Sequence, residues 1–202
     1  MSSSSVPGQQ LVRQSHGLEQ FFSLLGDRPR LQVLDLGEFT QANVQYITNL
    51  GHRLTSEDML RTADTIFGPG DPAETQADPG KREQFLDQVL QYGANHFDAV
   101  LVWDAFEHMS PPLVSDVIER LTKILRPQGL LLACFHADAP SDKVETFSFR
   151  IADGKTLLLI PRGARRLAQC FSNRAVERLF ERFQSVKFFL TRDYLREVIV
   201  RK

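Results

Sequence analysis

The sequence has few of the residues that mark several large classes of protein. It contains only two cysteines in 202 residues, Cys134 and Cys170, which are far apart and belong to no paired motif. This excludes a disulfide framework and a zinc knuckle, and it favours reduced thiols in a cytoplasmic protein. No uncharged apolar run reaches transmembrane length, and the first ten residues lack the basic and apolar parts of a secretory signal. We therefore expect a soluble protein that has no membrane partner and begins with a disordered arm, residues 1–15.

The chain also lacks an excess of charge of either sign. Its formal net charge is -1, which argues against a general nucleic-acid partner because such binding depends on concentrated positive charge. The distribution is uneven: residues 150–202 carry 13 Lys and Arg against 5 Asp and Glu, and the preceding residues carry 11 against 20. We interpret this as oppositely charged faces of one globule, with a basic partner-binding face and nucleic-acid modification as alternatives.

Several catalytic motifs are missing. The stretch "GPGDPAE" is not followed by Gly-Lys-Ser/Thr, so it is not a phosphate loop, and no GxGxxG marks a dinucleotide site. There is no GxSxG turn of the hydrolase type, and the histidines have no HExxH or similar spacing for a metal. The sequence therefore predicts no metal site.

Strand-like and helix-like patterns alternate along most of the chain. Apolar residues at helical spacing predict helices over 18–25, 44–50, 111–125 and 176–183. Short apolar runs predict strands over 31–36, 52–56, 97–103 and 130–136, and a closing antiparallel pair, 185–191 and 194–200, joined at Arg192-Asp193. Strands separated by helices indicate a doubly wound α/β domain, which we place over residues 16–202.

Three segments are harder to interpret. Residues 62–80 are rich in Gly, Pro and acids and predict an exposed loop. Residues 82–96 fit either a short helix or a third strand. The pair Asp153-Gly154 between two apolar runs predicts a β-hairpin, within an excursion over 138–170 near the acceptor side of the domain.

Four blocks together resemble the class I S-adenosylmethionine-dependent methyltransferases. They are "VLDLG", "GHRLTSED", "FDAVLVWDAFEHM" and "LTKILRPQGLLLACF", in the family's order and spacing over residues 32–136. The resemblance implies a mostly parallel seven-stranded-type sheet with helices on both faces and a C-terminal antiparallel hairpin. It also implies S-adenosylmethionine as the cofactor and methyl transfer to a small-molecule or protein acceptor, with a small molecule as the main expectation. In such sheets, ligands bind beyond the carboxyl ends of the strands.

The resemblance assigns roles to individual residues. Those placed near the cofactor are Asp35, Gly37, Glu38, Asn43, Glu57, Asp58, Asp87, Trp103 and Asp104. His108 and His136 are the candidate general bases, because imidazole titrates near neutral pH. Simpler roles stay open: a solvated turn for Asp58, an exposed helix position for Asp87, core packing for Trp103 and a structural role for His108.

The chain departs from the family in the loop after its first strand. Gly37 is present, but Phe39 and Gln41 stand where further glycines are expected, and we expect the Phe39 ring to take up volume beside the cofactor. This motivates a rival hypothesis from another class, a methyltransferase-like binding or scaffold protein without cofactor or activity.

Overall fold

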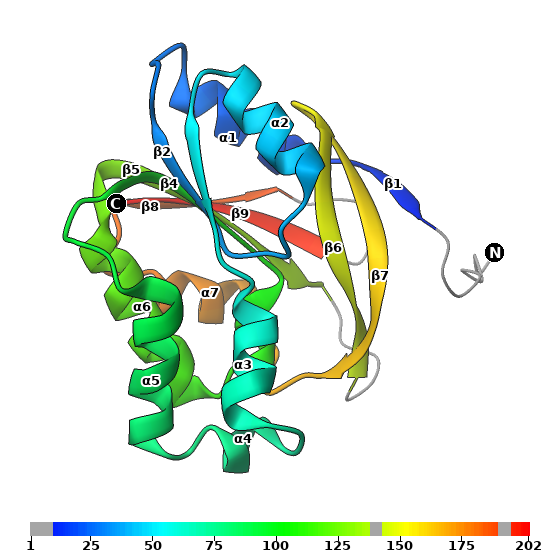
Figure 1. The fold of residues 1–202 in the computed structure, drawn as a ribbon, viewed down its shortest axis with the longest axis vertical. Coiled ribbons are helices and arrows are strands. Elements are labelled where there is room, and N and C mark those ends of the chain that lie inside the picture. Colours follow the sequence, from blue (N-terminus) through cyan, green and yellow to red (C-terminus); the bar gives the residue numbers. More distant parts are fainter. Residues whose placement is uncertain (1–9, 138–142, 190–194) are drawn as a thin grey trace.

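A computed structural model describes residues 10–137, 143–189 and 195–202. Its large sheet has six strands, five of which run in the same direction, while β9 is antiparallel to both of its neighbours (Figure 1). In spatial order the strands are β3 (Arg53–Ser56), β2 (Gln32–Asp35), β4 (Phe97–Trp103), β5 (Leu125–His136), β9 (Leu195–Arg201) and β8 (Ser185–Phe189).

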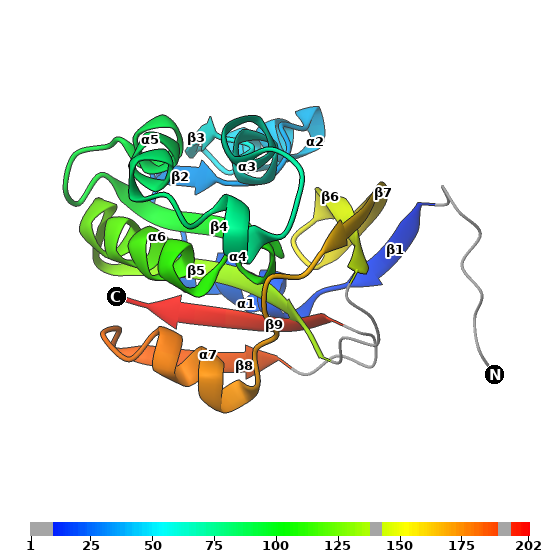
Figure 2. The same ribbon diagram turned by 90° about the horizontal axis from the view of Figure 1, so that it is seen from below.

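A second, small sheet lies beside the large one (Figure 2). Its three antiparallel strands, in spatial order, are β1 (Leu11–Gln14), β7 (Thr156–Arg166) and β6 (Lys143–Asp153). The prediction of a disordered arm over 1–15 is therefore wrong for β1, because its backbone finds hydrogen-bond partners along β7.

Helices cover both faces of the large sheet. One face packs against α1 (His16–Leu25), α2 (Gln41–Asn49) and the small sheet, and their buried side chains form one hydrophobic cluster. The other face packs against α3 (Met59–Phe67), α5 (Pro79–Leu90), α6 (Pro111–Ile124) and α7 (Asn173–Leu179). The short helices α4 (Pro72–Thr75) and η1 (Ala105–His108) complete the set. No helix of the described segments is both long and apolar enough to cross a membrane.

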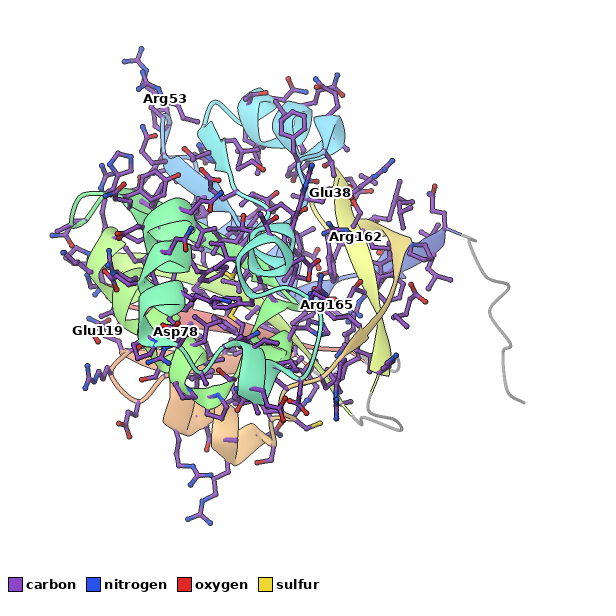
Figure 3. All side chains as sticks on the ribbon, turned by 60° about the horizontal axis from the view of Figure 1, so that its bottom comes forward. Glu38, Arg53, Asp78, Glu119, Arg162 and Arg165 are labelled. Carbon is purple, nitrogen blue, oxygen red and sulfur yellow. The ribbon has the colours of Figure 1, made fainter. Side chains whose placement is uncertain are left out.

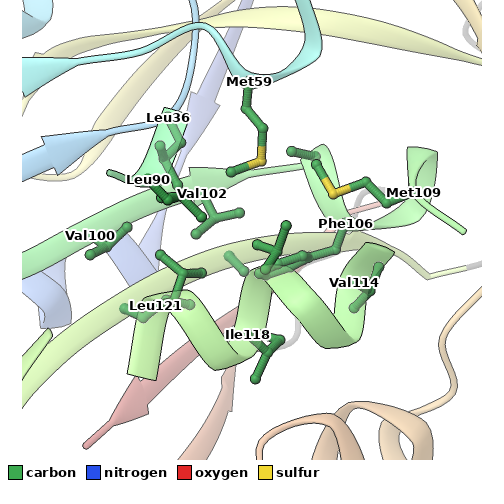
Figure 4. Packing of buried hydrophobic residues seen from close by; sticks show 14 of the residues in the cluster. Leu36, Met59, Leu90, Val100, Val102, Phe106, Met109, Val114, Ile118 and Leu121 are labelled. Carbon is green, nitrogen blue, oxygen red and sulfur yellow. The ribbon is translucent and has the colours of Figure 1, made fainter. Parts of the chain in front are cut away.

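The strand sequences explain this two-sided burial. Successive side chains of a strand point to opposite faces, so Val100 and Val102 enter the cluster under α5 and α6, while Ala99 and Leu101 enter the one under α1 and α2. Figure 4 shows Val100, Val102 and Leu121 packed together in the first cluster. A strand buried on both faces must be apolar throughout, as "FDAVLVW" nearly is.

The prediction of an exposed loop over residues 62–80 is wrong. Most of α3, all of α4 and the start of α5 lie in this range. The acids and prolines that suggested a loop are helix starts instead: Asp71 and Asp78 accept hydrogen bonds from backbone N–H groups at the starts of α4 and α5, and a proline follows each of them.

The alternative left open for residues 82–96 is resolved as a helix over most of its length, since α5 runs to Leu90. As a result, helices rather than a third strand connect β3 to β4. The described large sheet is mixed, and three of its five strand pairings are parallel. Its six strands correct the seven-stranded type that we expected.

The predicted hairpin is confirmed as β6 and β7, but its turn is shifted by one residue. Asp153 pairs with Thr156, so Gly154 and Lys155 form the turn, and the Asp153 carboxylate accepts a hydrogen bond from the Lys155 N–H. The terminal antiparallel pair is also confirmed, as β8 and β9. The junction at Arg192-Asp193 lies outside the described residues.

Two phenylalanines test whether residues 62–80, which the sequence predicted as a loop, contribute to the core. Phe67 of α3 is buried against Phe85, whereas Phe39 is 64% exposed. We expect Phe67→Ala to lower the free energy of unfolding by about 3–5 kcal/mol. Phe39→Ala is the matched control and should change it by less than about 0.5 kcal/mol. Urea unfolding measures both, and an equal small effect would show that α3 does not contribute to the core.

Candidate functional site

The carboxyl ends of β2, β3 and β4 meet at one edge of the large sheet, which we call the ligand edge. Asp35, the last residue of β2, is almost completely buried there. One carboxylate oxygen accepts hydrogen bonds from the Trp103 indole N–H (2.7 Å) and the Gly37 N–H (3.0 Å), and the other accepts from the Asn43 amide (2.8 Å). Burial raises the pKa of Asp35 although these three donors lower it. The chain's own donors therefore engage both carboxylate oxygens.

Trp103 brings an indole ring into the space beside the glycine turn. Its φ of 58° is unusual for a bulky residue and occurs at the end of β4, where the register with β5 is irregular. A Cβ atom added to Gly37 would lie 2.6 Å from the indole Cδ1. Glycine is thus needed here for the approach of a side chain of the same protein. Phe149 of β6 stacks on the indole, with ring centroids 4.9 Å apart and planes 12° apart.

Asn43, in the first turn of α2, ties the ligand edge to β6. Its amide donates to the Phe149 carbonyl (3.0 Å) as well as to Asp35, and its side-chain oxygen accepts from the Ile151 N–H (2.8 Å). The residue is almost completely buried. A single side chain therefore joins β2, α2 and the hairpin.

The acids after β3 are engaged as well. Asp58 caps α3 by accepting from the Arg61 N–H, and it also pairs with Arg162 of β7 at 2.8 Å. Glu57 accepts a hydrogen bond from the Tyr92 hydroxyl at 3.1 Å, and burial together with this carboxylate raises the pKa of Tyr92 to about 12. Figure 3 shows Arg162 and Arg165 reaching from β7 toward α3.

These contacts test whether S-adenosylmethionine fits the ligand edge. The acids and the glycine are of the right chemical type, but the Trp103 ring, the Phe149 ring and the backbone of β6 take up the space beside them. The expected obstruction by Phe39 is not observed, because its ring is exposed; Glu38 is half-buried, and Gln41 begins α2. In this arrangement the residues do not fit the cofactor, and the obstacles are the Trp103 indole and the hairpin strand β6 that packs on it.

A second group of polar side chains follows β4. Within the described part of the chain, four buried atoms of residues 104–110 have no hydrogen-bond partner: Asp104 Oδ2, Glu107 Oε1, His108 Nε2 and Ser110 Oγ. Burial raises the pKa of Asp104 to about 6, and the charge on His136 opposes this effect. Buried polar atoms without partners are rare in folded proteins and call for an explanation.

Glu107 and His136 form a buried pair at the ends of η1 and β5. One carboxylate oxygen of Glu107 contacts His136 Nδ1 at 2.6 Å and accepts from the His136 backbone N–H at 2.9 Å. A carboxylate in this position holds the ring in a fixed orientation, as in many catalytic histidine sites. The sequence pattern did not identify Glu107; its only signal was its position directly before His108.

His108 lies in a different environment. Its Nδ1 contacts the Arg166 carbonyl at 3.0 Å, and burial lowers its pKa to about 4, so its ring is neutral at pH 7. It lines a cavity of about 110 Å³ together with residues of α3, α4 and β7, including Gln76 and Arg165. A neutral ring that contacts a carbonyl through Nδ1 carries its lone pair on Nε2.

Asp87 is not brought to the ligand edge with the other predicted residues. It lies on α5, where its side chain is about half exposed and contacts Arg120 of α6 at 3.3 Å. No group of three or more acidic, histidine or cysteine side chains within the described residues is arranged to hold a metal ion.

Comparison with solved structures finds the same fold in methyltransferases. The first example is the 1,6-didemethyltoxoflavin-N1-methyltransferase of Burkholderia thailandensis, with bound 1,6-didemethyltoxoflavin and S-adenosylhomocysteine. It is 17% identical with a TM-score of 0.53, over 92% of this chain and 76% of that one. An S-adenosylmethionine-dependent methyltransferase from Mesorhizobium loti is 15% identical with a TM-score of 0.53, over 91% and 96% of the two chains. One from Methanosarcina mazei is 12% identical with a TM-score of 0.51, over 87% and 93%.

Sequence comparison adds no closer relative. No protein-family model matches the chain, and no curated protein matches it. Identities of 12–17% show a shared fold and leave activity open. The chain has a class I methyltransferase-like fold, as its four sequence blocks predicted.

Two asparagines of α2 test how firmly the hairpin is attached. We expect Asn43→Ala to lower the free energy of unfolding by about 2–4 kcal/mol, because it leaves buried backbone groups of β6 without partners. Asn49→Ala, at the exposed end of the same helix, is the control and should change it by less than about 0.5 kcal/mol. Chemical unfolding measures both, and equal effects would contradict the attachment.

Asp104 and His108 should affect the pH dependence of stability in opposite directions. The pKa of Asp104 is higher in the folded protein (about 6) than in the unfolded chain (3.8), so its contribution to stability falls as pH rises through this window. The pKa of His108 is lower in the folded protein (about 4 against 6.5), so its contribution rises with pH. Each of these two contributions to the free energy of unfolding is at most about 3 kcal/mol.

Single variants separate the two effects. Relative to the wild type, Asp104→Asn should become progressively more stable, and His108→Gln progressively less stable, between pH 4 and 6.5. Urea unfolding at several pH values measures both differences. Differences that do not change with pH would show that neither group is buried as described.

Proposed function

We propose that the protein is an S-adenosylmethionine-dependent methyltransferase that acts on a small-molecule or protein acceptor. The fold supports this class of activity, and the acids after β2 and β3 stand where the resemblance places cofactor contacts. Asp35, Gly37 and Asp58 would hold the cofactor once the hairpin and the Trp103 indole have moved. When bound, the cofactor would supply the methyl group.

The observation that carries the proposal is the set of unpartnered buried atoms on residues 104–110. A protein that only served as a scaffold would gain stability by replacing Asp104 and Glu107 with apolar residues, since a buried carboxylate oxygen without a donor is costly. Retaining them at the ends of β4 and β5 is the pattern of an active site, where ligands complete the hydrogen bonds.

His136 is our candidate for the group that takes a proton from the acceptor. Glu107 holds its Nδ1, which leaves Nε2 for the acceptor's hydroxyl or amine. His108 is a weaker base because its pKa is lowered to about 4, and it is better suited to accept a hydrogen bond from the acceptor. Most of the rate would come from positioning of the two reactants.

The filled ligand edge favours a second candidate function. A methyltransferase-like binding protein without cofactor would need its own side chains to satisfy Asp35 and Asp58, and the contacts with Trp103, Asn43 and Arg162 do this. For such a protein, the hairpin would be a fixed part of the fold.

Calorimetric titration with S-adenosylhomocysteine separates the two candidates. We expect the wild type to bind with a micromolar dissociation constant and Asp58→Ala to bind at least about tenfold more weakly, through loss of charge-assisted hydrogen bonds. Asp116→Asn, which alters an acid on the outer surface of α6 paired with Arg82, is the control and should bind like the wild type.

Absence of binding at millimolar S-adenosylhomocysteine, by protein that unfolds cooperatively, would contradict the enzyme and favour the binding protein. Binding that Asp58→Ala leaves unchanged would place the cofactor away from the end of β3.

A further inference from the structure

We propose that the β6–β7 hairpin is a gate on the ligand edge, closed in this structure by contacts that the cofactor must replace. The inference rests on the proposed function, since it concerns regulation of the same site. The ligand edge has acids and a glycine of the right chemical type for the cofactor, but side chains and backbone of the protein itself take up the space beside them.

The hairpin and the cofactor compete for the same groups. Asn43 bonds to the β6 backbone through both ends of its amide, and Asp58 pairs with Arg162 of β7. Phe149 covers the Trp103 indole, which itself lies against Gly37. Asp35, Gly37, Asn43 and Asp58 are therefore each engaged directly by the hairpin or by the indole on which the hairpin packs. Cofactor binding and the closed hairpin exclude each other.

In the part of the chain that the structure describes, the hairpin is held to the large sheet by side-chain contacts and not by strand pairing. No strand pairing joins the two sheets within the described residues, so withdrawal of β6 and β7 breaks no ladder of backbone hydrogen bonds in the large sheet. β1 is the fixed end of the small sheet, because Arg13 donates to the Leu195 carbonyl and pairs with Glu197 at the buried start of β9. Opening of the β6–β7 pair about β1 has to expose Phe149, Ile151, Leu157 and Leu159, which are almost completely buried in the cluster under α1 and α2, so cofactor binding must offset the loss of this burial.

The outer contacts of the hairpin are ion pairs between β7 and the segment after β3. Three acids of the β3–α4 segment pair with three arginines of β7: Asp58–Arg162, Asp64–Arg165 and Asp71–Arg166. The side chains of the last two pairs are between about a quarter and three-fifths exposed. Ion pairs at such positions contribute little and weaken in salt. The closed state should therefore depend on ionic strength.

Trp103 is the only tryptophan of the chain, so its fluorescence reports on the contact with Phe149. The experiment follows this fluorescence during titration with S-adenosylhomocysteine, at 50 and 500 mM sodium chloride. The test variant is Arg162→Gln/Arg165→Gln. The control, Arg174→Gln/Arg182→Gln, removes the same charge from exposed positions outside the hairpin.

We expect the ligand to change the Trp103 emission and the wild type to bind more tightly at high salt. The test variant should bind about fivefold more tightly than the wild type at low salt, as expected for the loss of two ion pairs, and should show a smaller salt dependence, since the Asp71–Arg166 pair remains. The control should behave like the wild type. Phe149→Ala is a second test of the inner contact; if it fails to fold, the arginine variant, which alters only partly exposed side chains, still decides the question.

The remaining outcomes overturn one proposal or both. Tight binding with unchanged emission, the same in all variants, would overturn the gate and leave the methyltransferase proposal standing. No binding by any variant, although the emission of the arginine variant shows that the hairpin has moved, would overturn the proposed function and the gate with it. No binding and no change in emission would identify the hairpin as a fixed part of a binding protein.

Discussion

The buried carboxylate of Asp35 is the interaction on which the rest of the site depends. A carboxylate at the end of a central parallel strand is costly to bury unless donors surround it. Here the donors are the Trp103 indole, the Asn43 amide and the Gly37 N–H, which come from the end of β4, the start of α2 and the adjacent turn. This one group therefore fixes the relative positions of three elements at the ligand edge.

The small sheet extends this arrangement. Because Asn43 uses its remaining amide hydrogen and its oxygen on β6, the hairpin is held by the same network that satisfies Asp35. Phe149 then packs on the indole, and the arginines of β7 reach the acids after β3. The neighbouring residues 104–110 differ, since three of their buried oxygens and one buried nitrogen are left without partners. One part of the site is satisfied by the chain itself, and the other keeps buried polar atoms without a hydrogen-bond partner.

Much of the fold could be predicted from the sequence, because the buried strands are read from continuous apolar runs and the helices from their spacing. "FDAVLVW" and "PPLVSDVIERLTKIL" are β4 and α6 within a residue or so. The helices between Asp58 and Leu90 were missed in part because Asp-Pro pairs start helices as well as loops. The strand at Leu11–Gln14 was missed because its partner, β7, is about 145 residues away in sequence.

The site was predictable in its residue types and not in its contacts. Asp35, Gly37, Asn43, Asp58 and Trp103 do lie together at the ligand edge, as a shared strand end requires. Their partners Phe149 and Arg162 belong to a hairpin whose docking depends on tertiary packing, which no local pattern records. For the same reason Glu107 became a candidate only through its contact with His136.

The most direct test of the account is the indole N–H signal of Trp103 in a proton–nitrogen NMR spectrum, since the chain has only this tryptophan. The account predicts that, without ligand, this hydrogen exchanges slowly with solvent because it is buried and donated to Asp35. Addition of S-adenosylhomocysteine should then shift the signal and speed its exchange as the hairpin withdraws. Rapid exchange in the free protein would contradict the closed network around Asp35, and with it the central claim.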